Sequence, residues 1–417
     1  DFGETWAPTC RMRVFRFILA EASLDRNIGT AQWDCTSAFL HADMDMDVWM
    51  EQPEGFNDGS GRVIHLQKAL YGLKQAPMLF HGVVRDYLLD LGAVQAKADE
   101  CLFTIREGGE WVKMLVHVDD FAVTYSSRAL YDKVFGKMKE RFMITDYGGE
   151  PISRFVGICV ERDVGDGSYK LHQKPYIEEL LDRLGLRGES HAQSPERGGT
   201  KAKLGPGQGE PSEAEKEFML SVPYREAVGA LFYLARATRF DISHAAGQVA
   251  RFMEDPRLEH WQAVLCIYRY LARTKDVSLV MRSEGMQCEM ADQFLEGLGD
   301  ADWAGCAETR QSHTGWLIRA GGSLVSWYSK RQTCVAQSTT EAEYVAAASV
   351  ANEVVWWRRL CVDFGYEFGG PVRVLCDNSS AVSLANHAGK FEATKHIALR
   401  YHVLRGITRS GASLKCS

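Results

Sequence analysis

The stretch "KMLVHVDDFAVT", from Lys113 to Thr124, places two adjacent carboxylates, Asp119 and Asp120, in the middle of an apolar run. The apolar residues on either side predict a hairpin of two strands. Desolvating two anions costs several kcal/mol unless a cation compensates their charge. Two interpretations are therefore open. The pair caps a hairpin turn, with one side chain bonded to the backbone, or it binds a divalent metal together with a third carboxylate elsewhere.

The composition is that of a soluble globular protein. The chain has 417 residues, with 46% apolar and 25% charged residues, and this length predicts two or three domains. No apolar run approaches the length of a membrane span, so no membrane association is expected. The 11 cysteines never occur as Cys-x-x-Cys, and we interpret them as reduced core residues of an intracellular protein.

The net charge of −7 argues by itself against a nucleic-acid binder. The charge is distributed unevenly, however. The segment from His41 to Asp58 has six acidic residues and no Lys or Arg, whereas the segment from Asn386 to Ser417 has six basic residues and one acidic residue. The basic end can track phosphates or form a solvated helix face, and charge does not decide between these alternatives.

The chain divides at a Gly- and Pro-rich connector, Leu184 to Glu217. Before it, short strand-like runs alternate with helices. After it, helical spacing of apolar residues predicts three helices, over Pro223–Thr238, Asp241–Glu254 and Arg257–Thr274. A third region begins near Gly297 and has strand, turn and helix signals in α/β order.

A third carboxylate, Asp34, lies upstream in "QWDCTSAFL" (Gln32–Leu40) at the end of an apolar and polar alternation. One acid from a strand and a pair from a hairpin can hold two magnesium ions for phosphoryl transfer. Between them, "ALYGLKQAPMLF" (Ala69–Phe80) contains a Gly turn that opens a helix, where backbone N–H groups and Lys74 can meet a triphosphate.

Seven segments then stand in order along the chain: "QWDCTSAFL", "MEQPEGF", "KALYGLKQAP", "HVDD", "PYREAVGALFYLA", "QSTTEAEY" and "CDNSSAV". Together they resemble the reverse transcriptase and ribonuclease H region of a copia-type long-terminal-repeat retrotransposon Pol polyprotein, over essentially the whole chain. The resemblance implies an α+β fold, a partial right hand followed by an α/β domain. The implied domains are a palm with partial fingers (1–184), a Gly/Pro-rich linker (185–217), a helical thumb or connection (218–285) and a ribonuclease H-like domain (286–417).

The resemblance also implies roles for residues in the first region. Asp34 and Asp119 would bridge both metal ions, and Asp120 would complete the site. Phe39 would exclude a ribose 2′-hydroxyl and so select deoxynucleotides. The implied nucleotide-binding residues, including the carbonyl of Cys35 as a further metal ligand, are Cys35, Phe39, Gly72, Lys74, Gln75 and Pro77.

The distal region carries a second set of acids. "LEGLGDADWAGC" puts Asp300 in a strand followed by a turn, and "VRVLCDNSSAV" ends an apolar strand at Asp377. Ser338 and Glu341 form a capping box, which gives Glu341 a structural role and leaves Glu343 to face the sheet. Asp300, Glu343 and Asp377 match the two-metal hydrolysis site of a ribonuclease H fold. Asp302 points to the same strand face as Asp300 and is the alternative first ligand.

Two function classes follow. The first is an RNA-directed DNA polymerase with ribonuclease H activity on RNA:DNA hybrids. It would use Mg²⁺, with Mn²⁺ as an alternative, and would act on an RNA template, a DNA primer and dNTPs. Integrase and capsid would be other products of its polyprotein, and it would act inside the cell, in cytoplasmic virus-like particles or in the nucleus. The second class is a catalytically impaired remnant that at most binds nucleic acid, since we expect the chain to be truncated at both ends relative to the family.

Overall fold

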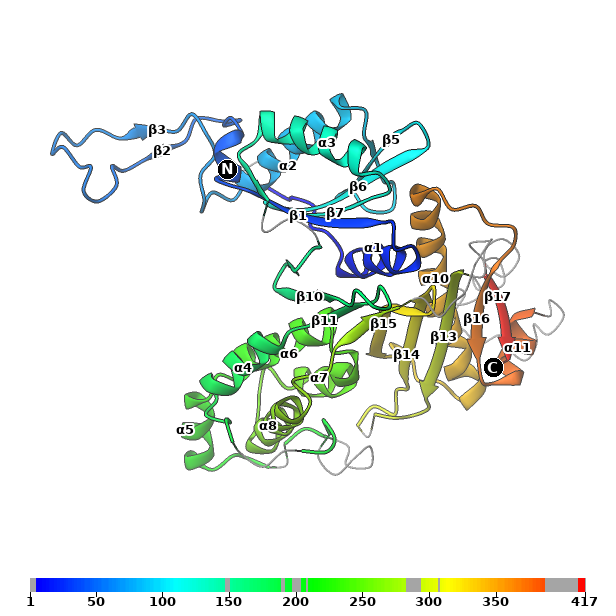
Figure 1. Cartoon of the computed structure of the whole chain (residues 1–417). Coiled ribbons are helices and arrows are strands. Elements are labelled where there is room, and N and C mark those ends of the chain that lie inside the picture. The colour runs from blue at the N-terminus through cyan, green and yellow to red at the C-terminus, as the bar shows by residue number, and fades with distance from the viewer. Residues whose placement is uncertain are drawn as a thin grey trace. The chain divides into compact units, whose positions relative to one another are not determined.

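The computed structural model covers most of the chain, and Figure 1 shows its helices and strands. By its internal contacts the chain divides into two compact units. The first comprises residues 1–18 and 25–156, and the second comprises residues 19–24 and 157–417. Within them the described residues are 5–146, 151–188, 192–196, 204–207, 209–282, 294–306, 308–386 and 412–416.

The first unit is built on an antiparallel sheet, which in the described residues has six strands in the order β4-β5-β6-β7-β1-β8. These strands are β1 (Gly29–Cys35), β4 (Val94–Gln95), β5 (Leu102–Glu107), β6 (Glu110–His117), β7 (Asp120–Tyr125) and β8 (Ile144–Asp146). Its other elements are η1 (Ala38–His41), β2 (Trp49–Met50), β3 (Ile64–His65), α2 (Ala76–Asp90), α3 (Arg128–Arg141), β9 (Arg154–Phe155) and the first part of α1 (Met12–Leu24), whose residues from Leu19 on belong to the second unit. Figure 1 shows α2 and α3 on one side of β1 and β7, and α1 on the other.

Strand β1 is largely buried on both faces, and its apolar and polar residues alternate between them. Trp33 and Cys35 belong to the core that α2 and α3 cover. The Trp33 indole donates a hydrogen bond of 2.9 Å to the hydroxyl of Tyr131 in α3. Because side chains alternate along a strand, Gln32 and Asp34 point to the opposite face of the sheet.

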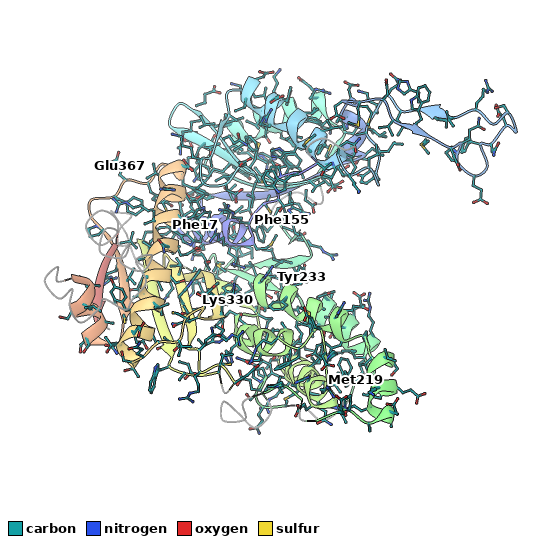
Figure 2. All side chains as sticks on the ribbon, turned by 180° about the vertical axis from the view of Figure 1, so that it is seen from behind. Phe17, Phe155, Met219, Tyr233, Lys330 and Glu367 are labelled. Atoms are coloured by element: carbon teal, nitrogen blue, oxygen red, sulfur yellow. The ribbon has the colours of Figure 1, made fainter. Side chains whose placement is uncertain are left out.

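In the second unit, strands of a small sheet precede and follow a group of helices along the chain. The strands of this sheet that lie in the second unit are β10 (Ile158–Arg162), β11 (Tyr169–His172) and β12 (Leu279–Met281), and β11 pairs with both of the others. Helix α4 (Lys174–Arg183) then packs into the same core as the helices that follow. The boundary between the two compact units lies between Val156 and Gly157, and the predicted end of the palm at residue 184 stays a prediction. Gly157 has φ +76° and lies against Tyr233, which Figure 2 labels, so a side chain at this position would collide.

The three predicted helices are confirmed. They are α6 (Tyr224–Ala237), the short η3 (Phe240–Ile242) continuing into α7 (Ser243–Ala250), and α8 (Leu258–Arg273). Their buried faces form one apolar core, in which Tyr268 also donates a hydrogen bond of 2.9 Å to the carbonyl of Ala227. Trp261, Val264 and Leu271 lie in this core, as the helical spacing predicts.

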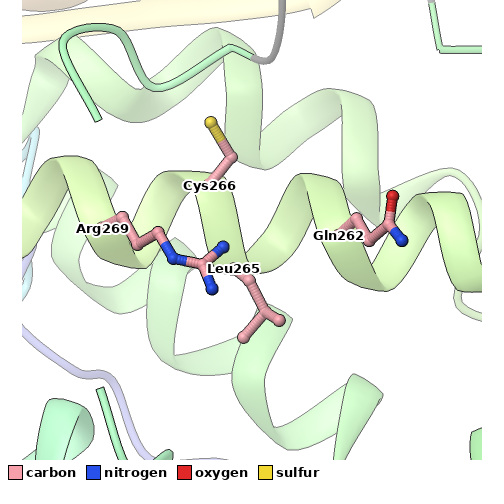
Figure 3. Close-up of a pocket in the computed structure, with 4 residues that line it drawn as sticks. All are labelled: Gln262, Leu265, Cys266 and Arg269. Carbon is pink, nitrogen blue, oxygen red and sulfur yellow. The ribbon is translucent and has the colours of Figure 1, made fainter. Parts of the chain in front are cut away.

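The Gly- and Pro-rich connector lies along these helices. Its described residues, up to Ser212, form neither helix nor strand, whereas α5 (Glu213–Ser221) occupies its predicted end. Leu186 is buried in the helical core, and the carbonyl of Ser194 lies 3.7 Å from the thiol of Cys266. Figure 3 shows Cys266 beside a pocket on α8 that is lined by Gln262, Leu265, Cys266 and Arg269. Gly198 and Gly199 lie outside the described residues.

The last region is a mixed sheet with the strand order β15-β14-β13-β16-β17 in the part of the chain that the structure describes. Strands β13, β14 and β15 are antiparallel, whereas β16 and β17 run parallel to β13. The elements are β13 (Leu295–Asp302), β14 (His313–Ala320), β15 (Ser323–Arg331), α10 (Thr339–Phe364), β16 (Val372–Cys376), α11 (Ser379–Asn386) and β17 (Ala412–Cys416).

Helix α10 packs closely on this sheet because β13 carries two glycines beneath it. A Cβ atom at Gly297 would lie 2.7 Å from Val350, and one at Gly299 would lie 2.6 Å from the same side chain. The chain thus has the mixed helix and sheet content expected of an α+β protein. None of the helices in the described part of the chain combines the length and apolar character needed to cross a bilayer.

Candidate active sites

The first candidate site forms where the end of β1 lies beside the start of β7. Asp34 and Asp120 are direct partners in the antiparallel register of these strands. The amide of Cys35 donates a hydrogen bond of 2.9 Å to the carbonyl of Asp119, which continues the pairing into the turn. Directly opposed residues project from the same face of a sheet, so Asp34 and Asp120 share one face.

The turn that carries Asp119 is short and strained. His117 pairs with Asp120, so only Val118 and Asp119 connect β6 to β7. Val118 has φ +56°, which a β-branched residue rarely adopts and which costs about 1–3 kcal/mol. On the other side, Nδ1 of His117 lies 3.3 Å from the thiol of the buried Cys10. The protein holds this turn in place against its conformational preference.

The carboxylates of this site have too little positive charge near them to balance their own negative charge. Burial, followed by the negative charge of Asp119, raises the pKa of Asp34. Burial raises the pKa of Asp120 to about 6, with the charges of Asp119 and Asp34 adding to it and Arg154 opposing it. Carboxylates that repel one another in a partly desolvated site are typical of a position that a cation occupies. A turn cap alone does not explain Asp34.

Phe39 lies beside these acids in a cluster of rings. It is 7% exposed on η1, and its ring centre lies 4.4 Å from that of Tyr71 and 6.3 Å from that of Phe80. Burial and the charge of Asp119 raise the pKa of Tyr71, which places the phenol next to the carboxylates. We did not single out Tyr71 from the sequence, although it directly precedes the predicted Gly turn.

The other nucleotide-binding candidates lie around the start of α2. Gly72 has φ +99°, a conformation that favours glycine. Gln75 is the N-cap residue of α2 and is 4% exposed, and its Oε1 has no hydrogen-bond partner among the described residues. Pro77 lies in the first turn of the helix, where its missing N–H is harmless. Lys74 is exposed at the turn that leads into the helix.

The second candidate site lies at one end of the mixed sheet, against α10. Glu343 is 7% exposed, and its Oε1 accepts a hydrogen bond of 3.2 Å from the amide of Ala301. Burial, then the charge of Asp300 and that of Asp377, raise the pKa of Glu343 to about 7. Asp377 follows the last residue of β16. The three predicted acids therefore interact, although they are far apart in sequence.

Glu341 and Asp302, each two residues from a predicted site acid, make other contacts. Glu341 caps α10 as predicted: its amide donates to Oγ of Ser338 at 3.2 Å, and its carboxylate accepts from the amide of Gln337 at 2.7 Å. The carboxylate thus bonds one residue before the N-cap and not Ser338 itself. The carboxylate of Asp302 lies over Gly305, so close that a side chain there would collide. Asp300, and not Asp302, raises the pKa of Glu343.

Cys376 is a member of this site that the sequence analysis missed. Its thiol lies 4.0 Å from Oε2 of Glu343. The ligand atoms of Glu343, Cys376 and Asp377 all lie within 4.8 Å of one another. The available signal was the position of a Cys immediately before a strand-end Asp, but we interpreted all cysteines as core residues.

Comparisons with known proteins match the chain to a reverse transcriptase family model and to Pol polyproteins of transposons. Residues 1–197 match the family model described as reverse transcriptase (RNA-dependent DNA polymerase). The chain is 36% identical over 411 residues to the Pol polyprotein from transposon TNT 1-94 of Nicotiana tabacum, covering 97% of this chain and 30% of that protein. It is 35% identical over 414 residues to the Pol polyprotein from transposon RE1 of Arabidopsis thaliana, covering 99% of this chain and 27% of that protein.

The chain thus spans less than a third of the length of these relatives. Among solved structures, the foamy viral protease-reverse transcriptase in complex with double-stranded DNA matches at 12% sequence identity and a TM-score of 0.20. That match covers 93% of this chain and 58% of the viral protein.

Proposed function

We propose that this chain belongs to the reverse transcriptase family found in retrotransposon Pol polyproteins, and that its first unit polymerises DNA on an RNA template. The observation that carries the proposal is the register of β1 and β7, which sets Asp34 opposite Asp120 beside the turn of Asp119. In this proposal the six-stranded sheet with α2 and α3 is the palm. Helices α6 to α8 correspond to the thumb or connection.

The residues of the first site fit divalent magnesium, with manganese as the alternative. All three side chains offer carboxylate oxygens, which are the ligands that hard cations prefer. Their mutual repulsion, seen in the raised pKa values of Asp34 and Asp120, is the penalty that a bound cation removes. When bound, the metal supplies charge that stabilises the attacking 3′-hydroxyl and the leaving pyrophosphate. The carbonyl of Cys35 is proposed as a further ligand.

The surrounding residues select and position the nucleotide. In this proposal the buried ring of Phe39, which packs against Tyr71 and Phe80, excludes a ribose 2′-hydroxyl and so favours dNTPs. The unsatisfied carboxamide of Gln75 offers a hydrogen bond to the bound nucleotide. Gly72, Lys74 and Pro77 shape the turn at the start of α2 where the triphosphate would lie.

For the second unit we propose hydrolysis of the RNA strand of an RNA:DNA hybrid, with Asp300, Glu343 and Asp377 as the metal-binding acids. The mixed sheet with α10 on one face supports a ribonuclease H-like domain. The relationship to Pol polyproteins supports an RNA template and DNA primer as partners, and integrase and capsid as other products of the element. It also supports an intracellular location, in cytoplasmic particles or in the nucleus.

Primer extension on an RNA template tests the first activity. Asp119→Asn should abolish Mg²⁺-dependent incorporation of dNTPs. The matched control is Asp132→Asn, which removes an equal charge from an exposed ion pair with Arg128 on α3 and should leave the rate unchanged. Incorporation that survives Asp119→Asn would contradict the proposal. A chain that binds template and primer but shows no extension with either metal would be the impaired remnant.

The second activity is tested with a labelled RNA:DNA hybrid. Glu343→Gln should abolish cleavage, whereas Glu341→Gln, two residues earlier on the helix and equally buried, should weaken the helix cap and retain cleavage. Loss of cleavage in both variants to the same extent would show that α10 acts only as a structural support.

A further inference from the structure

The second acid cluster includes a sulfur atom, which the proposed hydrolysis does not use. Cys376 ends β16 and is 2% exposed, with its thiol 4.0 Å from Oε2 of Glu343. Strand β16 packs against α10, so this contact is made inside the folded domain (Figure 1). Asp377 follows on the chain and completes a group of one thiol and two carboxylates within 4.8 Å.

The spacing of these atoms is close to that of a tetrahedral metal site. With bonds of about 2.3 Å to sulfur and 2.1 Å to oxygen, two ligands at the tetrahedral angle lie about 3.6 Å apart. The observed 4.0 Å between sulfur and Oε2 of Glu343 needs a contraction of only a few tenths of an ångström. Asp377 would supply the third ligand, and solvent the fourth.

Glu343 adds a second, independent indication. It is 7% exposed, and among the described residues its Oε2 receives no N–H donor, since the amide of Ala301 bonds to Oε1. A buried carboxylate that lies against a thiol and beside the acids Asp300 and Asp377 gathers negative charge that a cation would balance. A cation between the two atoms would satisfy both.

We propose that Cys376, Glu343 and Asp377 bind a thiophilic divalent cation, Zn²⁺ or its probe Cd²⁺. Hard cations such as Mg²⁺ take oxygen ligands and do not use the thiol, whereas zinc and cadmium accept mixed sulfur and oxygen donors. Coordination converts the thiol to a thiolate and releases its proton to solvent. The site shares two carboxylates with the proposed hydrolysis centre, so its occupation excludes the Mg²⁺ ions that hydrolysis needs. Binding itself does not require that the chain hydrolyse RNA.

Titration of the metal-free chain with Cd²⁺ tests this site directly, through the ultraviolet charge-transfer band of a cadmium-thiolate bond. We expect a band that Cys376→Ser abolishes. Glu343→Gln, which keeps the thiol, should weaken cadmium affinity by about tenfold or more. The control is Cys159→Ser, which removes a half-buried thiol from β10 and should leave the band unchanged.

An unchanged band in Cys376→Ser would overturn the proposal. If that variant does not fold, as circular dichroism would show, Cys376→Ala gives the same comparison in an apolar form. A chain that shows the band but never cleaves hybrids would contradict the proposed hydrolysis and support the metal site. A chain that cleaves hybrids without showing the band would contradict the metal site alone.

Discussion

Replacing Glu343 by Gln should stabilise the metal-free second unit in a pH-dependent way. Burial and the charges of Asp300 and Asp377 raise the pKa of Glu343 from 4.5 to about 7. The folded state therefore holds this proton more tightly than the unfolded state does. Its ionisation destabilises the fold, and stability is lost as the pH rises from about 4.5 through about 7. A neutral Gln removes this cost.

The difference between the pKa values of Glu343 in the unfolded and folded states corresponds to a loss of about 3 kcal/mol in folding free energy when Glu343 is fully ionised. Asp300 and Asp377 are exposed, so water screens part of their repulsion. We therefore expect a gain of about 1–2 kcal/mol at pH 8 for Glu343→Gln, and much less near pH 5. Because bound metal stabilises the ionised carboxylate, saturating Mg²⁺ should reverse the sign of the difference.

Hydrogen exchange of α10 and β13 amides measures this effect, with variant and wild type compared at the same pH so that intrinsic exchange rates cancel. The control, Glu341→Gln, has the opposite expectation. It replaces the carboxylate that accepts from the amide of Gln337 with a neutral carboxamide, a weaker acceptor, and should lower protection by about 1 kcal/mol. A Glu343→Gln variant that is equally or less protected than wild type at pH 8 without metal would refute the reasoning.

Val118 allows a test of strain in the first site: at φ +56°, Val118→Gly should be more stable than Val118→Ala by about 1 kcal/mol in urea unfolding. Equal stabilities would mean that this position is unstrained. Phe39→Val should raise ribonucleotide incorporation relative to deoxynucleotide incorporation by about tenfold or more, about 1.4 kcal/mol, in single-nucleotide extension; an unchanged ratio would remove Phe39 from this role. Ser338→Ala should lower the protection of the first turn of α10 by about 1 kcal/mol, and no change in hydrogen exchange would contradict the cap.

The local placement of the candidate acids could be predicted because each lies on a strongly patterned element. Alternation around Asp34 and the apolar flanks of the Asp119–Asp120 pair indicate strands, and strand periodicity fixes the face of each side chain. The strain at Val118 could not be predicted, since a β-branched residue by itself favours a strand. It arises because the register of β6 and β7 leaves only two residues for the turn.

Local sequence patterns could not predict which residues that are far apart in the chain become neighbours in the fold. Cys376 looks like a core cysteine in its own strand, and only the packing of α10 brings Glu343 beside it. The same reason explains the domain boundary. The alternation in β10 and β11 indicates strands, but their partner β12 lies beyond the entire helical region. We placed the expected boundary at Leu184 because the Gly- and Pro-rich connector begins there, although Leu186 packs into the helical core.

The pairing of β11 with β12 closes the helical region into a loop whose two ends are held together. Residues between Gln173 and Val277 leave the small sheet and return to it, so their length can vary without moving either flank. Loop-closure entropy grows only logarithmically with length, by about 0.6 kcal/mol for each doubling. Insertions in the exposed connector should therefore be far better tolerated than insertions in β10 or β11. Changes of length in the connector therefore leave the pairing of β11 with β12, and with it the positions of both flanking strands, intact.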